Sequence, residues 1–168
     1  ETEVLKTENV QVIENLEKAN AAAFIAERRL WDSIETIQDG FAVFDPNDIM
    51  IAANPAYLKV FDGLKHVRPG ISYTEILTLA VEEGIIDIGE MQRSEFVDAA
   101  LARWNAETRD PHVIKLWNGQ FIKLVDRRSS DGDMVSLCLN ITDSIRDAER
   151  LKEAMQKAEA ANRAKSAF

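Results

Sequence analysis

The sequence is poor in cysteine, in histidine and in basic residues. Its 168 residues include one cysteine, Cys138, and two histidines, His66 and His112. A single cysteine excludes an intramolecular disulfide and any metal site built from several cysteines. This cysteine content fits a protein of a reducing compartment. The 20 lysines and arginines are outnumbered by 29 aspartates and glutamates, which leaves a net charge of −9. Because phosphate groups are bound by clustered basic residues, this balance predicts no nucleic-acid partner and no binding to an anionic membrane surface.

Long apolar runs and the common catalytic motifs are also missing. No run approaches the roughly 18 to 20 apolar residues that span a bilayer, and no signal peptide leads the chain. The sequence contains no glycine-rich phosphate loop, HExxH, Cys-x-x-Cys or nucleophile elbow. We therefore expect a cytoplasmic fragment without catalysis or membrane contact of its own, excised from a larger protein that an unseen segment could anchor to a membrane.

Glycine and proline are absent from both ends, which indicates two long helices. None occurs before Gly40 or after Thr142. Apolar and small residues recur there at alternating spacings of three and four, as in the a and d positions of a coiled coil. This seam comprises Leu5, Asn9, Val12, Leu16, Ala19, Ala23, Ala26 and Leu30 in residues 1–37, and Ile145, Ala148, Leu151, Met155, Ala158 and Asn162 in residues 143–168.

The seam needs a partner surface, which is either a second copy of the chain or the chain's own domain. The first helix would be about 50 Å long at 1.5 Å per residue, which is longer than one ordinary domain can cover. We therefore expect a parallel homodimer through both helices. The alternatives are a first helix that packs on its own domain and a C-terminal helix that folds back on the sheet.

Between the helices, residues 39–55 predict a hairpin followed by a short helix. Residues 41–44 and 49–52 are apolar and β-branched, and the Asp45-Pro46-Asn47-Asp48 sequence between them is typical of a turn. Asn54 is a good N-cap and Pro55 is tolerated at the first helical position, so a helix is expected over residues 56–61.

The remaining residues predict two more helices and three strands. A helix over residues 73–83 starts at the capping residue Ser72 and ends before Gly84, and a second helix over residues 94–107 is capped by Ser94. Residues 85–93 are expected to be a connection. Strands follow at 112–116, 120–128 and 134–141, and Asn118-Gly119 predicts a type I′ turn between the first two.

This order of elements resembles a PAS sensory domain over residues 38–142. The resemblance implies an α+β fold, in which a five-stranded antiparallel sheet carries short helices on one face and long coiled-coil-type helices flank the domain. PAS domains that pass a signal onward typically end their last strand in Asp-Ile-Thr, and the corresponding residues here are Asn140, Ile141 and Thr142. Asn140 has no charge for a salt bridge, while Thr142 can cap the next helix. The residues implied in signal relay are Asp39, Asn54, Asn140 and Thr142.

The last eight residues, 161–168, resemble the segment just before the phosphoaccepting histidine of sensor histidine kinases. This resemblance implies a chain that stops before the His-box of an enzyme, with ATP and magnesium bound in an absent kinase domain and a response regulator as partner. Two alternatives are a ligand-free dimerisation spacer and a PAS module that controls another effector, such as a diguanylate cyclase or a transcription regulator.

Haem and flavin are disfavoured as cofactors, and no metal site is expected. Haem-binding PAS domains usually ligate iron through a histidine on the helix before the third strand, and residues 94–107 contain none. Flavin-binding relatives need an Asn-Cys-Arg motif after the first short helix, whereas residues 57–69 lack cysteine. His66 and His112 are interpreted as surface or structural residues, and Cys138 as a small buried apolar residue.

A small-molecule pocket between sheet and helices is possible, and a filled core is the alternative. The pocket candidates are Tyr57, Phe61, Ile76, Leu101, Trp104, Ile122, Leu124 and Cys138.

Overall fold

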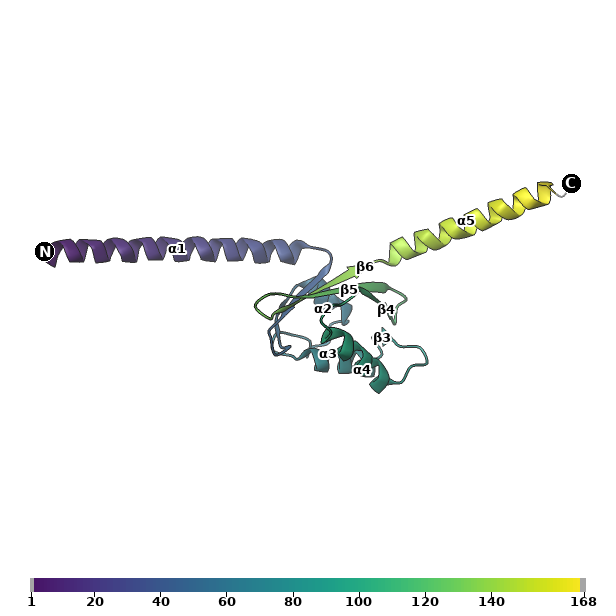
Figure 1. The fold of residues 1–168 in the computed structure, drawn as a ribbon, viewed down its shortest axis with the longest axis horizontal. Coiled ribbons are helices and arrows are strands. Elements are labelled where there is room, and N and C mark those ends of the chain that lie inside the picture. Colours follow the sequence, from purple (N-terminus) through teal and green to yellow (C-terminus); the bar gives the residue numbers. More distant parts are fainter. Residues whose placement is uncertain (1, 167–168) are drawn as a thin grey trace. The chain divides into compact units, whose positions relative to one another are not determined.

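The computed structural model describes residues 2–166, so the outermost residues of both predicted terminal helices, residues 1, 167 and 168, lie outside the described part. The chain divides into two units, residues 1–38 and residues 39–168 (Figure 1). The helices are α1 (Thr2–Thr36), α2 (Pro55–Val60), α3 (Tyr73–Glu82), α4 (Arg93–Trp104) and α5 (Thr142–Ser166). The strands are β1 (Gly40–Phe44), β2 (Met50–Ala53), β3 (Ile86–Asp87), β4 (His112–Leu116), β5 (Phe121–Arg128) and β6 (Met134–Asn140).

The six strands form one antiparallel sheet in the order β2-β1-β6-β5-β4-β3. The expected five-stranded sheet is thus extended by β3, which lies within the predicted connection and pairs Ile86 with Leu116. A two-residue strand is too short to show the alternation of apolar and polar residues by which strands are recognised. The α+β architecture is as predicted from the resemblance.

Three short helices, α2, α3 and α4, cover one face of the sheet (Figure 1). Two of their caps are as predicted: the Asn54 side chain accepts from the Tyr57 N–H, and the Ser72 hydroxyl accepts from the Glu75 N–H. The predicted Ser94 cap is wrong. The N-cap of α4 is Gln92, whose side chain makes no capping hydrogen bond, and Ser94 lies inside the first turn.

The hairpin between β4 and β5 uses a different turn from the predicted type I′. The Gly119 N–H donates to the Leu116 carbonyl at 3.0 Å, and the Leu116 N–H donates to the Gln120 carbonyl at 2.8 Å. Gly119 has φ of +82°, whereas Asn118 is not among the described residues with positive φ. This is a three-residue loop, a type I turn followed by one left-handed residue. The Asn118 side chain accepts from the Gln120 N–H at 3.1 Å and so stabilises the loop.

The hairpin between β1 and β2 repeats this turn with aspartate in the left-handed position. Asp48 has φ of +64°, a conformation that usually favours glycine. Its carboxylate accepts from the indole N–H of Trp104 at 2.9 Å and pairs with Arg128 at 3.4 Å. The side chain therefore makes contacts that glycine could not make, and these offset the cost of the backbone conformation.

The core lies between the sheet and the three helices and is centred on Trp104, which is fully buried. The Trp104 ring stacks on Tyr73, with a centroid distance of 3.6 Å and an interplanar angle of 14°. Phe44 from β1 meets Trp104 edge-on at 5.2 Å. These aromatic contacts fix α3 and α4 against the strands.

The pairing of β1 with β6 needs glycine at position 40. A Cβ atom there would lie 2.9 Å from the Cys138 Cβ and 3.0 Å from the Tyr57 Cα. Gly40 is the direct partner of Cys138 in the sheet. The missing side chain thus lets β1, β6 and the start of α2 approach closely.

Substitutions at Asp48 will separate its backbone role from its side-chain role. Asp48→Ala is expected to lower the free energy of unfolding by about 2 to 4 kcal/mol, because it combines left-handed strain with an unpaired buried indole N–H. Asp48→Asn, which keeps an acceptor and tolerates this conformation, should cost less than about 1 kcal/mol. Urea unfolding monitored by tryptophan fluorescence measures both, and Asp48→Gly should fall between them. Equal losses for Asp48→Ala and Asp48→Asn would contradict the assigned hydrogen bond.

Candidate ligand cavity and helix junctions

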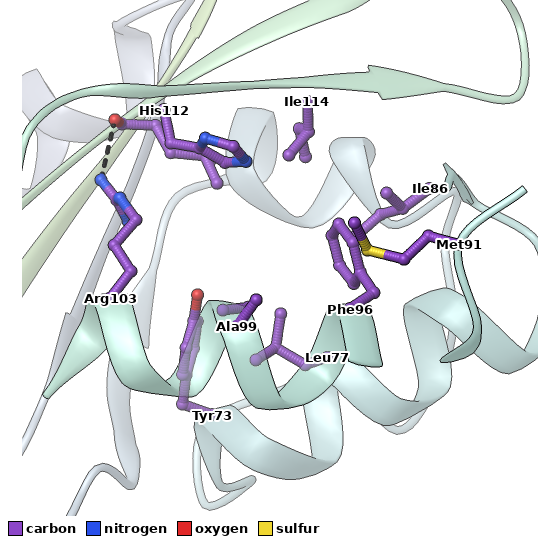
Figure 2. Close-up of a pocket in the computed structure, with 11 residues that line it drawn as sticks. Tyr73, Leu77, Ile86, Met91, Phe96, Ala99, Arg103, His112 and Ile114 are labelled. Carbon is purple, nitrogen blue, oxygen red and sulfur yellow. Dashed lines mark hydrogen bonds between the residues drawn. The ribbon is translucent and has the colours of Figure 1, made fainter. Parts of the chain in front are cut away.

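A cavity of about 300 Å³ lies within the PAS-like unit, between helices α3 and α4 and strands β3, β4 and β5. Figure 2 shows side chains from these elements around a central space. The lining residues are Tyr73, Leu77, Ile86, Met91, Phe96, Ala99, Ala100, Arg103, His112, Ile114 and Leu124. Most are apolar, which is typical of sites that bind small molecules.

Helix α4 contributes one face to the cavity wall. Phe96, Ala99, Ala100 and Arg103 follow the spacing i, i+3, i+4 and i+7, which places their side chains on the same side of a helix. Two alanines in the middle of this face leave room that larger residues would fill.

The polar groups of the cavity are Arg103, His112 and the Tyr73 phenol. Partial burial, and next the positive charge of Arg103, lower the pKa of His112 below its usual value of 6.5. Burial, and next the negative charge of Asp126, raise the pKa of Tyr73 far above 10. Tyr73 is therefore a neutral phenol at physiological pH.

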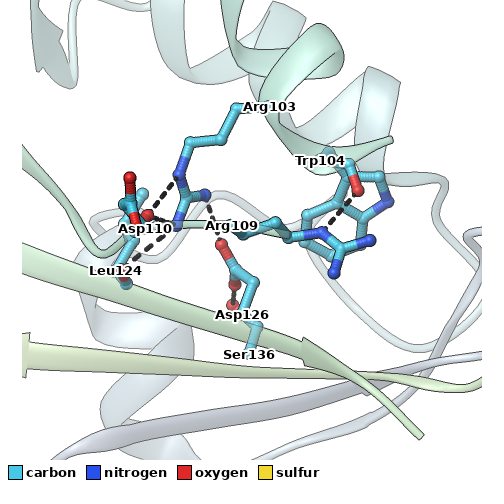
Figure 3. Close-up of polar contacts among 7 residues, drawn as sticks. All are labelled: Arg103, Trp104, Arg109, Asp110, Leu124, Asp126 and Ser136. Atoms are coloured by element: carbon cyan, nitrogen blue, oxygen red, sulfur yellow. Dashed lines mark hydrogen bonds and ion pairs between the residues drawn. The ribbon is translucent and has the colours of Figure 1, made fainter. Parts of the chain in front are cut away.

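Arg103 also holds the end of α4 against the sheet (Figure 3). Its guanidinium group pairs with the Asp126 carboxylate at 2.6 Å, and the Asp126 carboxylate accepts from the Ser136 hydroxyl at 2.5 Å. Asp126 is 4% exposed and Ser136 is 3% exposed. A buried carboxylate needs such partners, because an unpaired charge in the interior is costly.

The loop after α4 is tied to the same helix end. Arg103 donates to the Asp110 carbonyl through Nε at 3.1 Å and Nη2 at 3.0 Å, and to the Leu124 carbonyl at 3.3 Å. Arg109 donates to the Trp104 carbonyl at 2.7 Å (Figure 3). The helix end, the loop and strand β5 are thus one connected polar network.

The predicted pocket residues are divided between the core and two cavities. Leu124 lines the 300 Å³ cavity. Phe61, Ile76, Leu124 and Cys138 line a second cavity of about 30 Å³, which shares Leu124 with the first. Tyr57, Trp104 and Ile122 are buried core residues, and Leu101 is partly buried against that core. The filled core and the pocket are therefore both present: the region where the pocket was predicted is mostly filled, and a cavity remains beside α4.

Sequence reasoning missed most of the cavity lining. Helical spacing would have found Arg103 seven residues after Phe96, but a charged residue was not considered for an apolar stripe. His112, interpreted as a surface or structural residue, is exposed and lies on the cavity wall. Burial raises the pKa of the Cys138 thiol, and the negative charge of Asp126 adds to this, as befits an inert core residue.

The exit from the sheet to α5 is pinned by Thr142. Its hydroxyl accepts from the Phe121 N–H at 2.9 Å and donates to the Asn140 side chain at 2.6 Å. Asn140 also accepts from the Thr142 N–H at 3.1 Å. Thr142 is the first residue of α5 and not the predicted cap before it. The exit of β6 is held by neutral hydrogen bonds between Asn140 and Thr142, where a salt bridge was expected to be needed.

The entry to β1 is pinned by Asn54, which is 1% exposed. Its side-chain oxygen accepts from the Phe41 N–H at 2.8 Å and the Tyr57 N–H at 3.0 Å. Its amide donates to the Asp39 carbonyl at 2.9 Å. Among the four residues implied in signal relay, Asn54 thus makes this contact through its side chain and Asp39 through its backbone carbonyl.

The seam residues of both long helices are exposed in the single chain, except Ile145 in the first turn of α5, which is half-buried. They include Leu5, Val12, Leu16, Ala19, Ala23, Ala26 and Leu30 on α1, and Leu151, Met155 and Ala158 on α5. Within residues 2–166, no helix is long and apolar enough to cross a membrane. The same described residues contain no group of three or more His, Cys, Asp or Glu side chains placed to hold a metal ion.

Comparison with known proteins gives one family. A family model described as PAS fold matches residues 34–149. The non-motile and phage-resistance protein of Caulobacter vibrioides is 28% identical over 125 residues, which cover 74% of this chain but 13% of that protein. The chain therefore spans about an eighth of the length of this relative.

Solved structures with a similar fold have low sequence identity. The PAS domain of an HTR-like protein from Haloarcula marismortui is 13% identical with a TM-score of 0.48, over 74% of this chain and 99% of that one. A domain of a sensory box sensor histidine kinase/response regulator from Geobacter sulfurreducens is 19% identical with a TM-score of 0.40, over 69% and 95% of the two chains.

Removal of the Arg103 guanidinium group will show how strongly the buried carboxylate depends on it. Arg103→Ala is expected to lower the free energy of unfolding by about 3 to 5 kcal/mol, because Asp126 would stay buried without its cation. In the Arg103→Ala background, Asp126→Asn should restore part of this loss by removing the unpaired charge. Urea unfolding of the two single variants and the double variant gives the coupling energy. Additive losses would show that the two side chains act independently.

Proposed function

The chain belongs to the PAS fold family, and on that premise we propose that it is the sensor and dimerisation module of a sensor histidine kinase. In this proposal α1 and α5 pair in parallel with the same helices of a second copy. The PAS domain between them detects a signal, and α5 carries the resulting change toward the kinase domains.

One observation carries the proposal: the apolar seam on both long helices is exposed. Val12 is 64% exposed and Leu16 is 59% exposed on α1, while Leu151 is 63% exposed and Met155 is 58% exposed on α5. Large apolar side chains at a and d positions are buried when two helices supercoil around each other. A contiguous apolar stripe left in water is a common sign of an interaction surface.

The kinase part of the proposal is supported by the sequence at the end of α5. Residues 161–168 resemble the segment that precedes the phosphoaccepting histidine in sensor histidine kinases, with residues 167 and 168 outside the described part. In the whole protein, ATP and magnesium would bind to a separate kinase domain. The phosphoryl group would then pass to a response regulator.

The relay would depend on the junction at Thr142. Because its hydroxyl accepts from the Phe121 N–H, the first turn of α5 follows any movement of β5. Two helices that meet along a seam can adopt two discrete packings, and a signal shifts their populations by favouring one of them.

A charged residue in the seam of α1 should weaken the dimer. Leu16→Asp places a carboxylate in an apolar interface, and we expect the dissociation constant to rise about tenfold or more, since burying an unpaired charge is unfavourable. The matched control is Ala21→Asp, which adds the same charge at the outward f position of the heptad. Analytical ultracentrifugation of the 168-residue chain measures both. A monomeric parent chain, or equal dissociation constants for the two variants, would contradict pairing through the seam.

Changes in the seam of α5 should alter kinase output in the full-length protein. Met155→Asp is expected to change the autophosphorylation rate several-fold in either direction, because it disturbs the packing of the output helix. Ala160→Asp, at an f position of the same helix, should leave the rate unchanged. The assay is incorporation of phosphate from labelled ATP by the purified full-length protein. Equal rates for Met155→Asp and the parent would rule out relay through α5.

A further inference from the structure

We propose that the 300 Å³ cavity binds an aliphatic monocarboxylate, with Arg103 and His112 holding the carboxylate group. The inference rests on the proposed sensor function and names the chemical class of the signal. The proposed binding site is the part of this cavity next to α4 and β4. The centre of the domain, between the sheet and the helices, is mostly filled by core side chains.

The apolar part of the ligand would lie at one end of the cavity. Figure 2 shows Phe96, Met91 and Ile86 grouped at the end away from Arg103, with Leu77 between this group and Tyr73. Removing apolar surface from water favours binding by roughly 0.8 kcal/mol for each buried CH₂ group. Met91 and Phe96 have flexible or planar side chains that adapt to a chain of methylene groups.

The polar end of the cavity offers hydrogen-bond donors and the guanidinium charge of Arg103, which is shared with the buried Asp126 carboxylate at 2.6 Å. Arg103 and His112 lie next to each other there (Figure 2), and the eleven lining residues include no aspartate or glutamate. This is unusual in a chain whose net charge is −9. Because the pKa of His112 is lowered below 6.5, its imidazole contributes an N–H donor rather than a fixed positive charge. A charged guanidinium group and an N–H donor on the same wall are complementary to a carboxylate.

Both basic residues have hydrogen-bonding capacity left. The guanidinium group has five N–H donors. Arg103 makes four hydrogen bonds, to Asp126, to the Leu124 carbonyl and twice to the Asp110 carbonyl, so one donor remains. The His112 imidazole forms no hydrogen bond to any described residue of the chain. A carboxylate accepts at both oxygens and can use one donor from each side chain.

A ligand at this position would be coupled to the exit of the sheet. Arg103 pairs with Asp126, and Asp126 accepts from Ser136 on β6. Strand β6 ends at Asn140, which bonds to Thr142 at the start of α5. A carboxylate that draws the guanidinium group toward itself therefore acts on strand β6 through the Asp126–Ser136 hydrogen bond, and the backbone of β6 leads to the Asn140–Thr142 contact at the start of α5.

The test is isothermal titration calorimetry of the 168-residue chain with straight-chain carboxylates from hexanoate to decanoate, below their micelle concentrations. The matched primary alcohols serve as neutral probes. At least one carboxylate should bind, about tenfold or more tightly than its alcohol, because hydrogen bonds to charged groups are the stronger ones. His112→Gln should reduce this preference, and the parent His112 imidazole signals should shift in an NMR titration.

Two alanine variants locate the binding site. Ala99→Leu fills the cavity and should weaken binding of the carboxylate about tenfold or more, since little room would remain for the probe. Ala102 lies on the same helix, is exposed and does not line the cavity. The Ala102→Leu variant should therefore bind the carboxylate like the parent. Circular dichroism checks that both variants are folded.

Several results would overturn the inference. These are no binding by any carboxylate of the series, equal binding of acid and alcohol, or equal losses in Ala99→Leu and Ala102→Leu. None of them affects the proposed dimer, which is tested separately by ultracentrifugation of the seam variants.

Discussion

The fold depends on one requirement, that the indole N–H of the fully buried Trp104 must have an acceptor. Asp48 supplies it from the first hairpin turn, at the cost of a left-handed backbone conformation. The ring stacks on Tyr73 at the start of α3 and contacts Phe44 in β1. A single side chain thus fixes the first hairpin, α3 and α4 relative to one another. Because α4 is held in this way, its other residues have defined positions.

Arg103 is the residue that gains most from this arrangement. It directly precedes Trp104, so the rotation of α4 that buries the indole also directs the guanidinium group toward Asp126 and the cavity wall. The core and the cavity are therefore not independent parts of the domain. A change in the packing of Trp104 would move the positive charge at the polar end of the cavity, and a ligand there would act on the core through the same helix end.

The sequence predicted those features that depend on neighbouring residues. Asn54 and Pro55 indicated the start of α2, and Asn118-Gly119 indicated a hairpin, although the turn type was wrong because Gly119 alone has positive φ. Features that depend on distant residues were missed. Nothing near Asp48 in the sequence reveals that Trp104 needs its carboxylate. Likewise, the cavity wall combines residues of five elements, and only their meeting in the folded chain shows that two basic groups share one end of it.

The position of β6 between β1 and β5 has a consequence for how the domain forms during synthesis. Residues 40 and 138 are direct partners in the middle of the sheet, although nearly the whole domain separates them along the chain. Contacts of such long range slow folding, because a large loop must close before they form. The hairpin of β1 and β2 has no central partner until β6 has left the ribosome. The sheet is therefore completed only when the first residues of α5 are also about to emerge, so the sheet and the start of α5 are assembled together.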